Sequence, residues 1–538
     1  LLSLAHSSHS GYGSDDARAK PLSRRRLAPP MAEPAAAKRG IPPKDDFNAW
    51  YPFMVEAAEL VDKRYPVKGM DVWRPYGWKA MRLIDGLTHA EMERTGHQEV
   101  NFPLLVPEQL LEKENRLVSR LQRARAEGVD PSELRMDEET TGFAKEVYWV
   151  KHAGETELDV PMFLRPTSET AMYTMFPLWI RSHADLPLKT YQMVNTFRYE
   201  TKQTRSFIRV REIHFFEAHT CHVDEDDATR QIEEDLEIAA RLMHDLCLPV
   251  LVARRPVWDT FPGAHYTVGI DVVMPDGRTL QVASVHHYRD QWARAFDVRY
   301  EDVKGEQQYC HQTTYGMSER LLGAVVGVHG DDRGLILPPA IAPHQAVIVP
   351  VLAKKGANEV LAACNKLQAQ LRDAGLRVHL DDRDLRPGQK YYDWEIRGVP
   401  LRFELGPRDL ASGECVLVPR TGGKSNAPLA GAAEVARETL EAVADELRKR
   451  ARKLKDTCMH TLPALERSGA GRLTLAEPVA PGRIYELPFD GSDADAGAVE
   501  ELTGLSFLGD AREPFTKARK CAVTGESTKR CVWLARTY

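Results

Sequence analysis

The stretch Asn195-Thr196-Phe197-Arg198-Tyr199-Glu200 decides the fold, together with the turn-like TKQTRS (201–206) and the apolar FIRVREIHFFEAHT (207–220) that follow it. This order of strand-forming, turn-forming and strand-forming residues predicts two antiparallel strands joined by a loop. Side chains two residues apart in a strand share a face, so we expect Arg198 and Glu200 to project to the same side. A guanidinium can bind a phosphate through two hydrogen bonds, and a carboxylate can accept a hydrogen bond from an amino group. The hairpin therefore favours a nucleotide site.

A second arginine stands where a strand is expected to end and a helix to begin. Tyr315-Gly316-Met317-Ser318-Glu319-Arg320 leads into the apolar run Leu321-Leu322-Gly323-Ala324. The first turn of a helix suits a phosphate because its backbone N–H groups are unpaired, so Arg320 is expected to meet a second phosphate there. Taken singly, each arginine is more often part of a surface ion pair, and the residues alone leave both interpretations open.

Composition limits the class of protein. The chain has 538 residues, 43% hydrophobic and 28% charged, which is typical of a soluble globular protein of about three or four domains. No stretch approaches the roughly 18 uninterrupted apolar residues of a membrane helix, so no membrane association is expected. The net charge of -6 excludes a chain that is basic throughout but allows a local basic surface for nucleic acid. Eight cysteines without regular pairing favour a reducing cytoplasm.

The first two thirds of the chain divide into a tail and one long domain. Residues 1–40 lack helical or strand periodicity and are expected to be disordered. Residues 41–343 form a mixed stretch without a linker, in which amphipathic patterns predict helices over 47–65 and 83–95. Residues 116–141 are highly charged and contain Gly and Pro, so they are expected to form a surface insertion.

The pattern changes after Pro343, where strand-like and helical segments alternate. Strands are expected at 346–352, 377–380, 400–405 and 415–419, and helices at 357–374 and 432–454. Alternation of this kind predicts a small α/β domain with a largely parallel sheet over residues 344–455. Residues 456–538 are then expected to form a C-terminal domain.

Several motifs resemble a known family. Leu164-Arg165-Pro166-Thr167-Ser168-Glu169-Thr170, the Phe197-Arg198-x-Glu200 segment with its FEAHTCH continuation (216–222), and Gly316-x-x-x-Arg320 resemble consecutive signatures of the class II aminoacyl-tRNA synthetases. The chain is similar to the prolyl-tRNA synthetases of archaeal and eukaryotic type from about residue 45 to its terminal tyrosine, through DDFNAWY (45–51), YPVKGMDVWRPYGW (65–78), FPLLVP (102–107), WIRSHADLPLK (179–189), HGDDRGLILPP (329–339) and GVPLRFELGPRDL (398–410). The resemblance implies an α+β fold: a class II catalytic domain with an antiparallel sheet, an α/β anticodon-binding domain and a small C-terminal α+β domain.

The same resemblance implies ATP-dependent activation of proline to prolyl-adenylate and its transfer to tRNA(Pro), by a cytoplasmic homodimer. The helical segment around residues 45–95 would contribute to the dimer interface. Activation brings a carboxylate against the α-phosphate of ATP, so the enzyme must neutralise charge and align two anions rather than supply a nucleophile. Mg²⁺ would bridge the phosphates, and no metal site built by the protein is expected.

The resemblance also assigns roles to individual residues. Arg198 would bind the α-phosphate and the substrate carboxylate, Glu200 the adenine amino group and Arg320 the γ-phosphate, which makes the two arginines the catalytic pair. The complete ATP set implied is Arg198, Glu200, Gln281, Ser284 and Arg320. The implied amino-acid set is Thr167, Glu169, Arg198, Phe215, Glu217, His219 and His286. The anticodon would be bound by Glu395, Arg402 and Lys424, since RNA readers hydrogen-bond splayed bases.

Some residues depart from the pattern of the family. The chain has Phe215 and Tyr315 where tryptophan is usual, Ala218 where glycine is usual, and Ala283-Ser284-Val285-His286 where Gly-Thr-Ser-His is usual. These departures are expected beside the amino acid, where a single methylene changes binding by about 1–3 kcal/mol. They leave open a divergent paralogue that activates a proline analogue or acts as an inhibitor-resistant copy. An inactive, RNA-binding regulatory relative is the alternative of another class, against which the retained arginines argue.

Zinc is the other departure. The family often holds zinc through four cysteines in its C-terminal domain, and a structural zinc site needs four ligands. Only Cys458, Cys521 and Cys531 lie in that region here, with His460 as one further ligand type. Zinc is therefore not expected.

Overall fold

The computed structural model describes residues 40–127, 147–200, 202–353, 355–467 and 473–538. The chain from Ile41 onward forms one compact unit. Residues 1–39 of the expected tail and 128–141 of the expected insertion lie outside the described residues. Within the described ranges, no helix combines the length and the apolar character that crossing a membrane requires.

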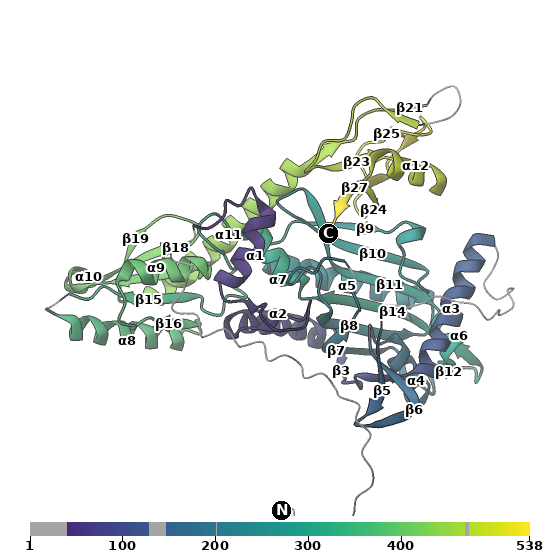
Figure 1. Cartoon of the computed structure of the whole chain (residues 1–538), viewed down its shortest axis with the longest axis horizontal. Helices are drawn as coiled ribbons and strands as arrows, with labels where there is room; N and C mark the ends of the chain where they lie inside the picture. Colours follow the sequence, from purple (N-terminus) through teal and green to yellow (C-terminus); the bar gives the residue numbers. More distant parts are fainter. Residues whose placement is uncertain (1–39, 128–146, 201, 354, 468–472) are drawn as a thin grey trace, which may run out of the picture. The chain divides into compact units, whose positions relative to one another are not determined.

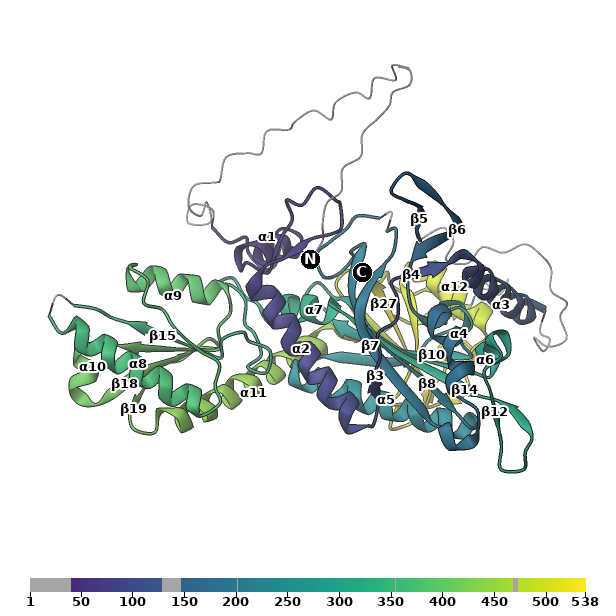
Figure 2. The same cartoon turned by 90° about the horizontal axis from the view of Figure 1, so that it is seen from below.

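Eleven strands form the main sheet (Figures 1 and 2). In spatial order they are β20 (Met459–Thr461), β23 (Ile484–Pro488), β27 (Cys531–Thr537), β24 (Ser506–Ala511), β9 (Val250–Arg254), β10 (Tyr266–Val273), β11 (Arg278–Arg289), β14 (His311–Ser318), β8 (Glu212–His222), β7 (Leu188–Phe197) and β3 (Gln98–Glu99). Strands β7, β8, β14, β11, β10 and β9 pair antiparallel with their neighbours in this series. The hairpin expected from residues 195–220 is the β7–β8 pair, which lies near the β3 edge of the main sheet.

The last part of the chain extends the main sheet. Strand β24 pairs with β9, with Asp510 opposite Arg254, and β27 runs parallel to the start of β11, with Arg278 opposite Arg536. In Figure 1 these yellow strands adjoin the teal strands β9 and β10. Strands β20, β23, β24 and β27 therefore belong to the same sheet as strands of the larger domain. The domain boundary expected at residue 456 stays a prediction.

Helices cover one face of the main sheet. Helices α5 (Glu225–Asp245) and α7 (Arg320–His329) pack on that face, and α1 (Phe47–Ala57) and α2 (Pro75–Arg94) share their hydrophobic core. Helix α5 begins after Asp224, whose side chain accepts a hydrogen bond from the Asp227 backbone N–H at 2.8 Å. Helix α2 begins at Pro75, because proline suits the first helical position, and it is therefore longer than the 83–95 expected. Helix α1 ends earlier than expected, just before Glu59, which has a positive φ.

The expected surface insertion is partly core. Helix α3 (Glu108–Glu127) contains the first part of it, and Leu117 and Leu121 are buried in a cluster with Phe176 and Trp292. Leucines four residues apart lie on one helix face, so they form an apolar stripe that the many charges of the segment obscure. The expectation of a surface segment was therefore wrong for Leu117 and Leu121.

A second sheet of five strands follows. Its order is β16 (Val378–Leu380), β15 (Ala346–Pro350), β17 (Leu401–Leu405), β18 (Glu414–Pro419) and β19 (Ser425–Pro428). Strand β15 is parallel to β16 and β17, whereas β17, β18 and β19 are antiparallel, so the sheet is mixed and not largely parallel as expected. Helices α8 (Ala357–Asp373) and α11 (Ala432–Cys458) share one core with this sheet, and α9 (Pro387–Ile396) packs its Trp394 against Val347 and Val349 on the other face.

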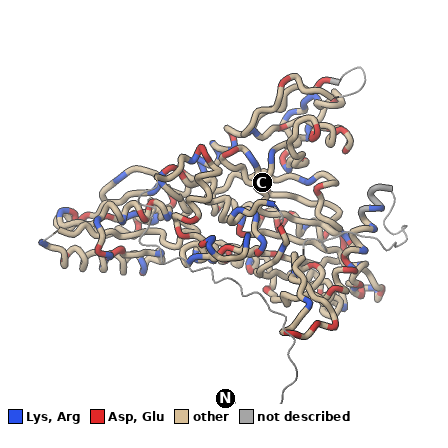
Figure 3. The backbone as a smooth tube through the Cα atoms, in the orientation of Figure 1, with Lys and Arg blue, Asp and Glu red and all other residues tan. Residues whose placement is uncertain are grey.

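The remaining elements are short. They are helices α4 (Glu169–Trp179), α6 (Gln291–Phe296), α10 (Pro407–Ser412) and α12 (Asp493–Thr503), and strands β1 (Val61–Asp62), β2 (Val72–Trp73), β4 (Leu105–Pro107), β5 (Tyr148–Ala153), β6 (Thr156–Leu164), β12 (Arg299–Glu301), β13 (Gln307–Tyr309), β21 (Leu465–Arg467), β22 (Leu473–Leu475), β25 (Arg519–Lys520) and β26 (Ser527–Thr528). In Figure 3, blue cationic and red anionic residues are scattered among longer tan stretches of the described backbone. Any phosphate-binding charge must therefore be concentrated locally.

Candidate active site

Polar side chains form rows across the face of the main sheet that is turned away from α5. One row runs over β7, β8, β14 and β11 through the cross-strand partners Gln192, Glu217, Gly316 and Ser284. The next row runs over the same strands and β10 through Thr190, His219, Thr314, His286 and Thr267. Strand register therefore brings together residues that lie far apart in the sequence.

Alternation along the strands corrects part of the sequence interpretation. Ala218, Val285 and Tyr315 belong to the hydrophobic core that α5 and α7 cover. Because neighbouring side chains in a strand point to opposite faces, these three residues face away from the polar rows. The expectation that Ala218 and Val285 lie beside the amino acid was wrong, whereas Phe215 and Ser284 do line the cavity described next.

A cavity of about 850 Å³ opens on this polar face. Its walls include most residues expected to bind ATP and the amino acid: Thr167, Glu169, Arg198, Glu200, Phe215, Gln281, Ser284, His286 and Arg320. Glu217 and His219 do not line it but are fully buried, and both hydrogen-bond within the wall. The structure thus groups these eleven residues around one cavity.

Part of the cavity wall is built by the β7–β8 loop. Strand β7 ends at Phe197, so Arg198 and Glu200 follow the strand and do not lie on it as expected. The Glu200 backbone N–H donates to the Arg198 carbonyl at 2.8 Å, which turns the chain out of the ladder. The Arg198 Nε donates to the Pro166 carbonyl at 3.2 Å, and the Glu200 carboxylate pairs with Arg209 at 2.8 Å.

Arg320 is the first residue of α7, as expected from the sequence. Its Nε donates to the Ile208 carbonyl at 2.9 Å and its Nη1 to the Gln281 carbonyl at 3.1 Å. Burial, followed by the charges of Arg198 and Arg209, lowers the pKa of Arg320 to about 10. The side chain therefore stays cationic at neutral pH in a cluster of like charges, which is the arrangement that an anionic ligand stabilises.

One buried carboxylate, Glu169, lines the cavity, and a second, Glu217, lies buried behind the same wall. Glu169, at the start of α4, accepts hydrogen bonds from Thr167 Oγ1 at 2.5 Å and from Tyr288 Oη at 2.9 Å. Glu217 accepts from the Ser168 backbone N–H at 3.1 Å, from the Ser168 hydroxyl and from Gln192 Nε2 at 3.0 Å. Burial alone would raise the pKa of Glu217, but hydrogen bonds from His219, Ser168 and Gln192 lower it to about 2. Anionic carboxylates in such a pocket suit a cationic ligand.

The two histidines of the wall have assigned partners. His219 contacts Glu217 Oε2 through Nε2 at 3.2 Å and Tyr173 Oη through Nδ1 at 3.1 Å. His286 contacts Thr267 Oγ1 at 2.8 Å and Ser284 Oγ at 3.0 Å. Burial first, and then the charges of His219 and Arg255, lower the pKa of His286 to about 3, so its ring is neutral at physiological pH.

One possible metal-ligand grouping lies in this wall. In the described parts of the chain, Glu169, Glu217 and His219 are the one group of three acidic, histidine or cysteine side chains whose ligand atoms lie within 4.8 Å of one another. Cys521 accepts hydrogen bonds at its Sγ from the backbone N–H groups of Asp490 at 3.1 Å and Thr524 at 3.4 Å.

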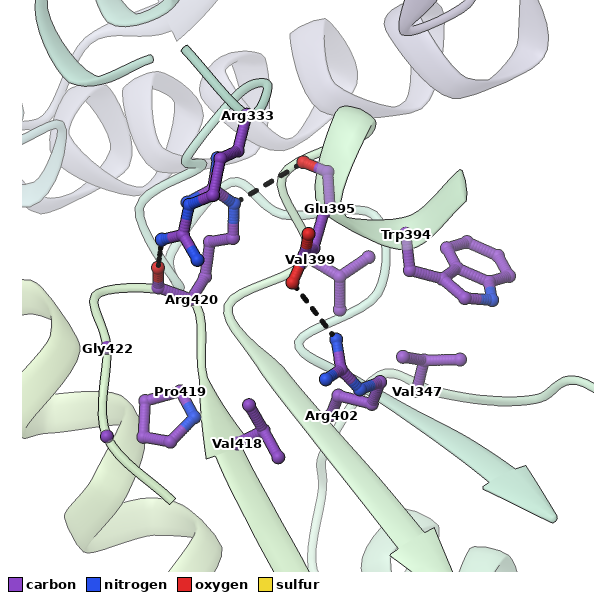
Figure 4. Close-up of a pocket in the computed structure, with 11 residues that line it drawn as sticks. Arg333, Val347, Trp394, Glu395, Val399, Arg402, Val418, Pro419, Arg420 and Gly422 are labelled. Carbon is purple, nitrogen blue, oxygen red and sulfur yellow. Dashed lines mark hydrogen bonds and ion pairs between the residues drawn. The ribbon is translucent and has the colours of Figure 1, made fainter. Parts of the chain in front are cut away.

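A second, smaller pocket of about 100 Å³ lies at the five-stranded sheet (Figure 4). Glu395 and Arg402, two of the three residues assigned to the anticodon by resemblance, line it, whereas Lys424 lies outside it and pairs with Glu404 at 2.9 Å. Arg402 pairs with Glu404 at 3.0 Å and with Glu395 at 3.5 Å. Its guanidinium also lies over the Tyr391 ring, 4.1 Å from the centroid.

Sequence reasoning missed several residues at the two sites. Arg333 and Arg420 line the smaller pocket, and the Arg420 guanidinium forms two hydrogen bonds with Asp331, at 2.9 and 2.5 Å. Arg209 lines the large cavity, where it joins Glu200 to the backbone oxygen of Tyr538 at 3.1 Å. Arg209 lies in the motif that contains Arg198, and Arg333 lies in the quoted motif 329–339, so both had a signal in the sequence. Arg420 depends on tertiary contacts.

Comparison with known proteins places this geometry in a family. Residues 148–329 match the tRNA synthetase class II core domain (G, H, P, S and T), and residues 345–453 match the anticodon binding domain. A proline--tRNA ligase of Thermococcus kodakarensis is 48% identical over 92% of this chain and 98% of its own length. The chain belongs to the proline--tRNA ligase family. Another member of this family, from Methanosarcina mazei, is 45% identical over 94% of this chain and 100% of its own length.

Solved structures of the family agree. The Giardia lamblia prolyl-tRNA synthetase in complex with prolyl-adenylate has a TM-score of 0.82 and 34% identity, covering 92% of this chain and 99% of that one. The Cryptosporidium parvum enzyme complexed with halofuginone and AMPPNP has a TM-score of 0.82 and 29% identity, covering 93% of this chain and 97% of that one. The resemblance to prolyl-tRNA synthetases and the α+β class II fold with an anticodon-binding domain are therefore confirmed.

Proposed function

We propose that this chain activates proline with ATP and transfers the prolyl group to tRNA(Pro). The reaction expected from the sequence is confirmed at the level of the family by relatives at 45–48% identity over most of the chain, and so is its class as an aminoacyl-tRNA synthetase. The comparisons lend no support to a paralogue with another substrate or to an inactive RNA-binding relative. The single observation that carries the assignment is a cavity lined by Arg198, Arg320 and the buried Glu169, with Glu217 buried behind its wall.

These charges match the two substrates. Arg198 and Arg320 suit the phosphates of ATP and the carboxylate of proline, and Glu169 and Glu217 suit the cationic ring nitrogen. The proline carboxylate oxygen then forms a bond to the α-phosphorus while the bond from that phosphorus to the bridging oxygen breaks, so that pyrophosphate leaves. Arg198 would stabilise charge at the reacting phosphorus and Arg320 charge on the leaving group. Gln281 and Ser284 also line this cavity.

Magnesium would accompany ATP by bridging its phosphates and neutralising their charge. The carboxyl group beside Arg320 belongs to Glu319, and its Oε2 is buried without a hydrogen-bond partner in the described chain. Burial raises the pKa of Glu319 to about 8, so without a bound cation this group is mostly protonated at neutral pH. We derive no step from Mg²⁺.

We also propose that the chain acts as a cytoplasmic homodimer. We propose in addition that each chain is divided into domains after residues 343 and 455. Tyr65, Val67, Val72 and Trp78, within the segment expected at the interface, expose apolar surface. A second copy would cover such surface. Light scattering is expected to give twice the chain mass, and a mass equal to one chain would contradict the dimer.

The reaction is tested by ATP–pyrophosphate exchange with proline, alanine, cysteine and proline analogues. Exchange that depends on proline, followed by charging of tRNA(Pro), is the expected result. Exchange with an analogue in preference to proline would overturn the substrate assignment.

A further inference from the structure

Tyr288 is a fully buried residue to which the proposed reaction assigns no role. It lies on β11 two residues after His286, on the same face of the sheet, but it does not line the cavity. Its ring stacks parallel to that of His286 with centroids 6.3 Å apart and packs against Trp292 at 5.5 Å. By packing alone it would be an ordinary core tyrosine.

Its hydroxyl group has a more specific position. Tyr288 Oη lies 2.9 Å from Glu169 Oε1, while Thr167 Oγ1 lies 2.5 Å from the other oxygen, Glu169 Oε2. The two donors come from different elements, β11 and the turn between β6 and α4, so they fix the carboxylate plane from two directions. Burial raises the pKa of Tyr288 well above its usual value, so the hydroxyl keeps its proton and acts as the donor.

Glu169 faces the cavity, is 1% exposed and begins α4, where the helix N-terminus favours negative charge. Each carboxylate oxygen can accept two hydrogen bonds, so one donor per oxygen leaves capacity on both for a ligand. A cyclic amino acid such as proline presents two N–H donors on its charged ring nitrogen. A carboxylate that is already held in place binds them without losing the freedom of its own side chain.

We propose that Tyr288 is a positioning residue that holds the Glu169 carboxylate toward the cationic ring nitrogen of the substrate and thereby selects a secondary ammonium over a neutral ring. This inference rests on the proposed function. Tyr288 touches neither the substrate nor the reacting atoms, and it acts through Glu169 alone.

The test is Tyr288→Phe, which removes the hydroxyl group and keeps the ring that fills the core. Tyr300→Phe is the matched control, because Tyr300 lies in the same hydrophobic cluster and donates its hydroxyl to the Val223 carbonyl at 2.9 Å, outside the cavity. In pyrophosphate exchange, the KM for proline is expected to rise roughly tenfold or more in Tyr288→Phe, the usual cost of a hydrogen bond to a charged group. The KM for ATP and kcat should stay within about twofold in both variants.

Two further measurements separate positioning from packing. Tetrahydrofuran-2-carboxylate has a ring oxygen in place of the charged nitrogen, so its inhibition constant against proline should be the same in the parent and in Tyr288→Phe. Combining Tyr288→Phe with Glu169→Gln should raise the dissociation constant for proline, measured by calorimetry, no further than Glu169→Gln alone. Equal proline KM in parent and Tyr288→Phe, or parallel loss of proline and tetrahydrofuran-2-carboxylate binding, would overturn the inference. Absence of proline-dependent exchange in the parent would instead overturn the proposed function.

Discussion

Two arginines, Arg320 in the large cavity and Arg402 in the small pocket, are held in opposite ways. In the large cavity, backbone carbonyls orient Arg320, at 2.9 Å from Ile208 and 3.1 Å from Gln281. In the small pocket, carboxylates orient Arg402, at 3.0 Å from Glu404 and 3.5 Å from Glu395. A carbonyl fixes the direction of a guanidinium but leaves its net charge, whereas a carboxylate fixes the direction and cancels the charge.

The difference matches the ligands expected from the sequence, a triphosphate in the large cavity and a nucleobase in the small pocket. A triphosphate requires uncompensated positive charge in a site that excludes water. A nucleobase is neutral and is distinguished by the direction of its hydrogen bonds, so a rigid and nearly neutral group of donors and acceptors suits it. The comparison teaches that the partners of an arginine indicate its ligand better than the arginine itself.

The largest expected effect is on the arginines of the large cavity. Arg320→Ala should lower pyrophosphate exchange by at least about two orders of magnitude, because one preorganised charge contact is worth roughly 3–4 kcal/mol. Arg198→Ala should do the same. Arg299→Ala, at a half-exposed arginine on the distant β12–β13 ribbon, is the control and should keep full exchange. Near-normal exchange in Arg320→Ala would contradict the view that the charge of Arg320 acts on the phosphates of ATP.

Arg402 of the small pocket should show a smaller effect, on the charging of tRNA and not on pyrophosphate exchange. Arg402→Ala is expected to lower the kcat/KM for charging of tRNA about tenfold, since a contact to a base is worth roughly 1–3 kcal/mol. Pyrophosphate exchange without tRNA should be unchanged, because the contact is remote from the reacting atoms. A parallel loss of exchange would mean that Arg402 supports the fold rather than the RNA.

The apolar wall of the cavity should respond to Phe215 and not to Val285. Phe215→Trp should lower the KM for proline several-fold, because the larger ring buries more apolar surface, which is worth about 25 cal/mol per Å². The room for it is limited, since Phe215 Cζ lies 3.1 Å from where a Cβ on Gly316 would stand. Val285→Ser should leave the proline KM unchanged and lower the melting temperature by several degrees, because it places a hydroxyl group in the core. An altered proline KM in Val285→Ser would contradict the alternation of side chains on β11.

The smallest effect concerns the carboxyl group beside Arg320. Burial raises the pKa of Glu319 to about 8, so it is neutral below that pH and becomes negative above it. The ionised Glu319 carboxylate would neutralise the charge of Arg320, as Glu404 and Glu395 neutralise that of Arg402. The KM for ATP should therefore rise a few-fold between about pH 7 and 9. Glu319→Gln should remove this rise while matching the parent at pH 7. An equal pH profile in both would show that Glu319 does not ionise in this range.

The sequence predicted what depends on local pattern. The β7–β8 hairpin, the start of α7 at Arg320 and the alternation of strand and helix after Pro343 were all visible in the spacing of apolar and turn residues. The direction of β18 and β19 was not, because a strand has the same pattern in a parallel and an antiparallel pair. The hydrogen bond from Tyr288 to Glu169 was equally invisible, since it joins residues 119 positions apart.

The ribosome makes the chain from its N-terminus to its C-terminus, whereas neighbouring strands of the main sheet come from distant parts of the chain. Arg255, which follows β9, donates a hydrogen bond to the Leu508 carbonyl of β24, 253 residues further along the chain. At about 5–20 residues per second, a ribosome leaves β9 without this neighbour for roughly 10–50 s. An unpaired strand edge is a template for wrong pairing during that interval. Recovery of soluble enzyme from a fast-translating host should therefore depend on chaperones or on slowed elongation.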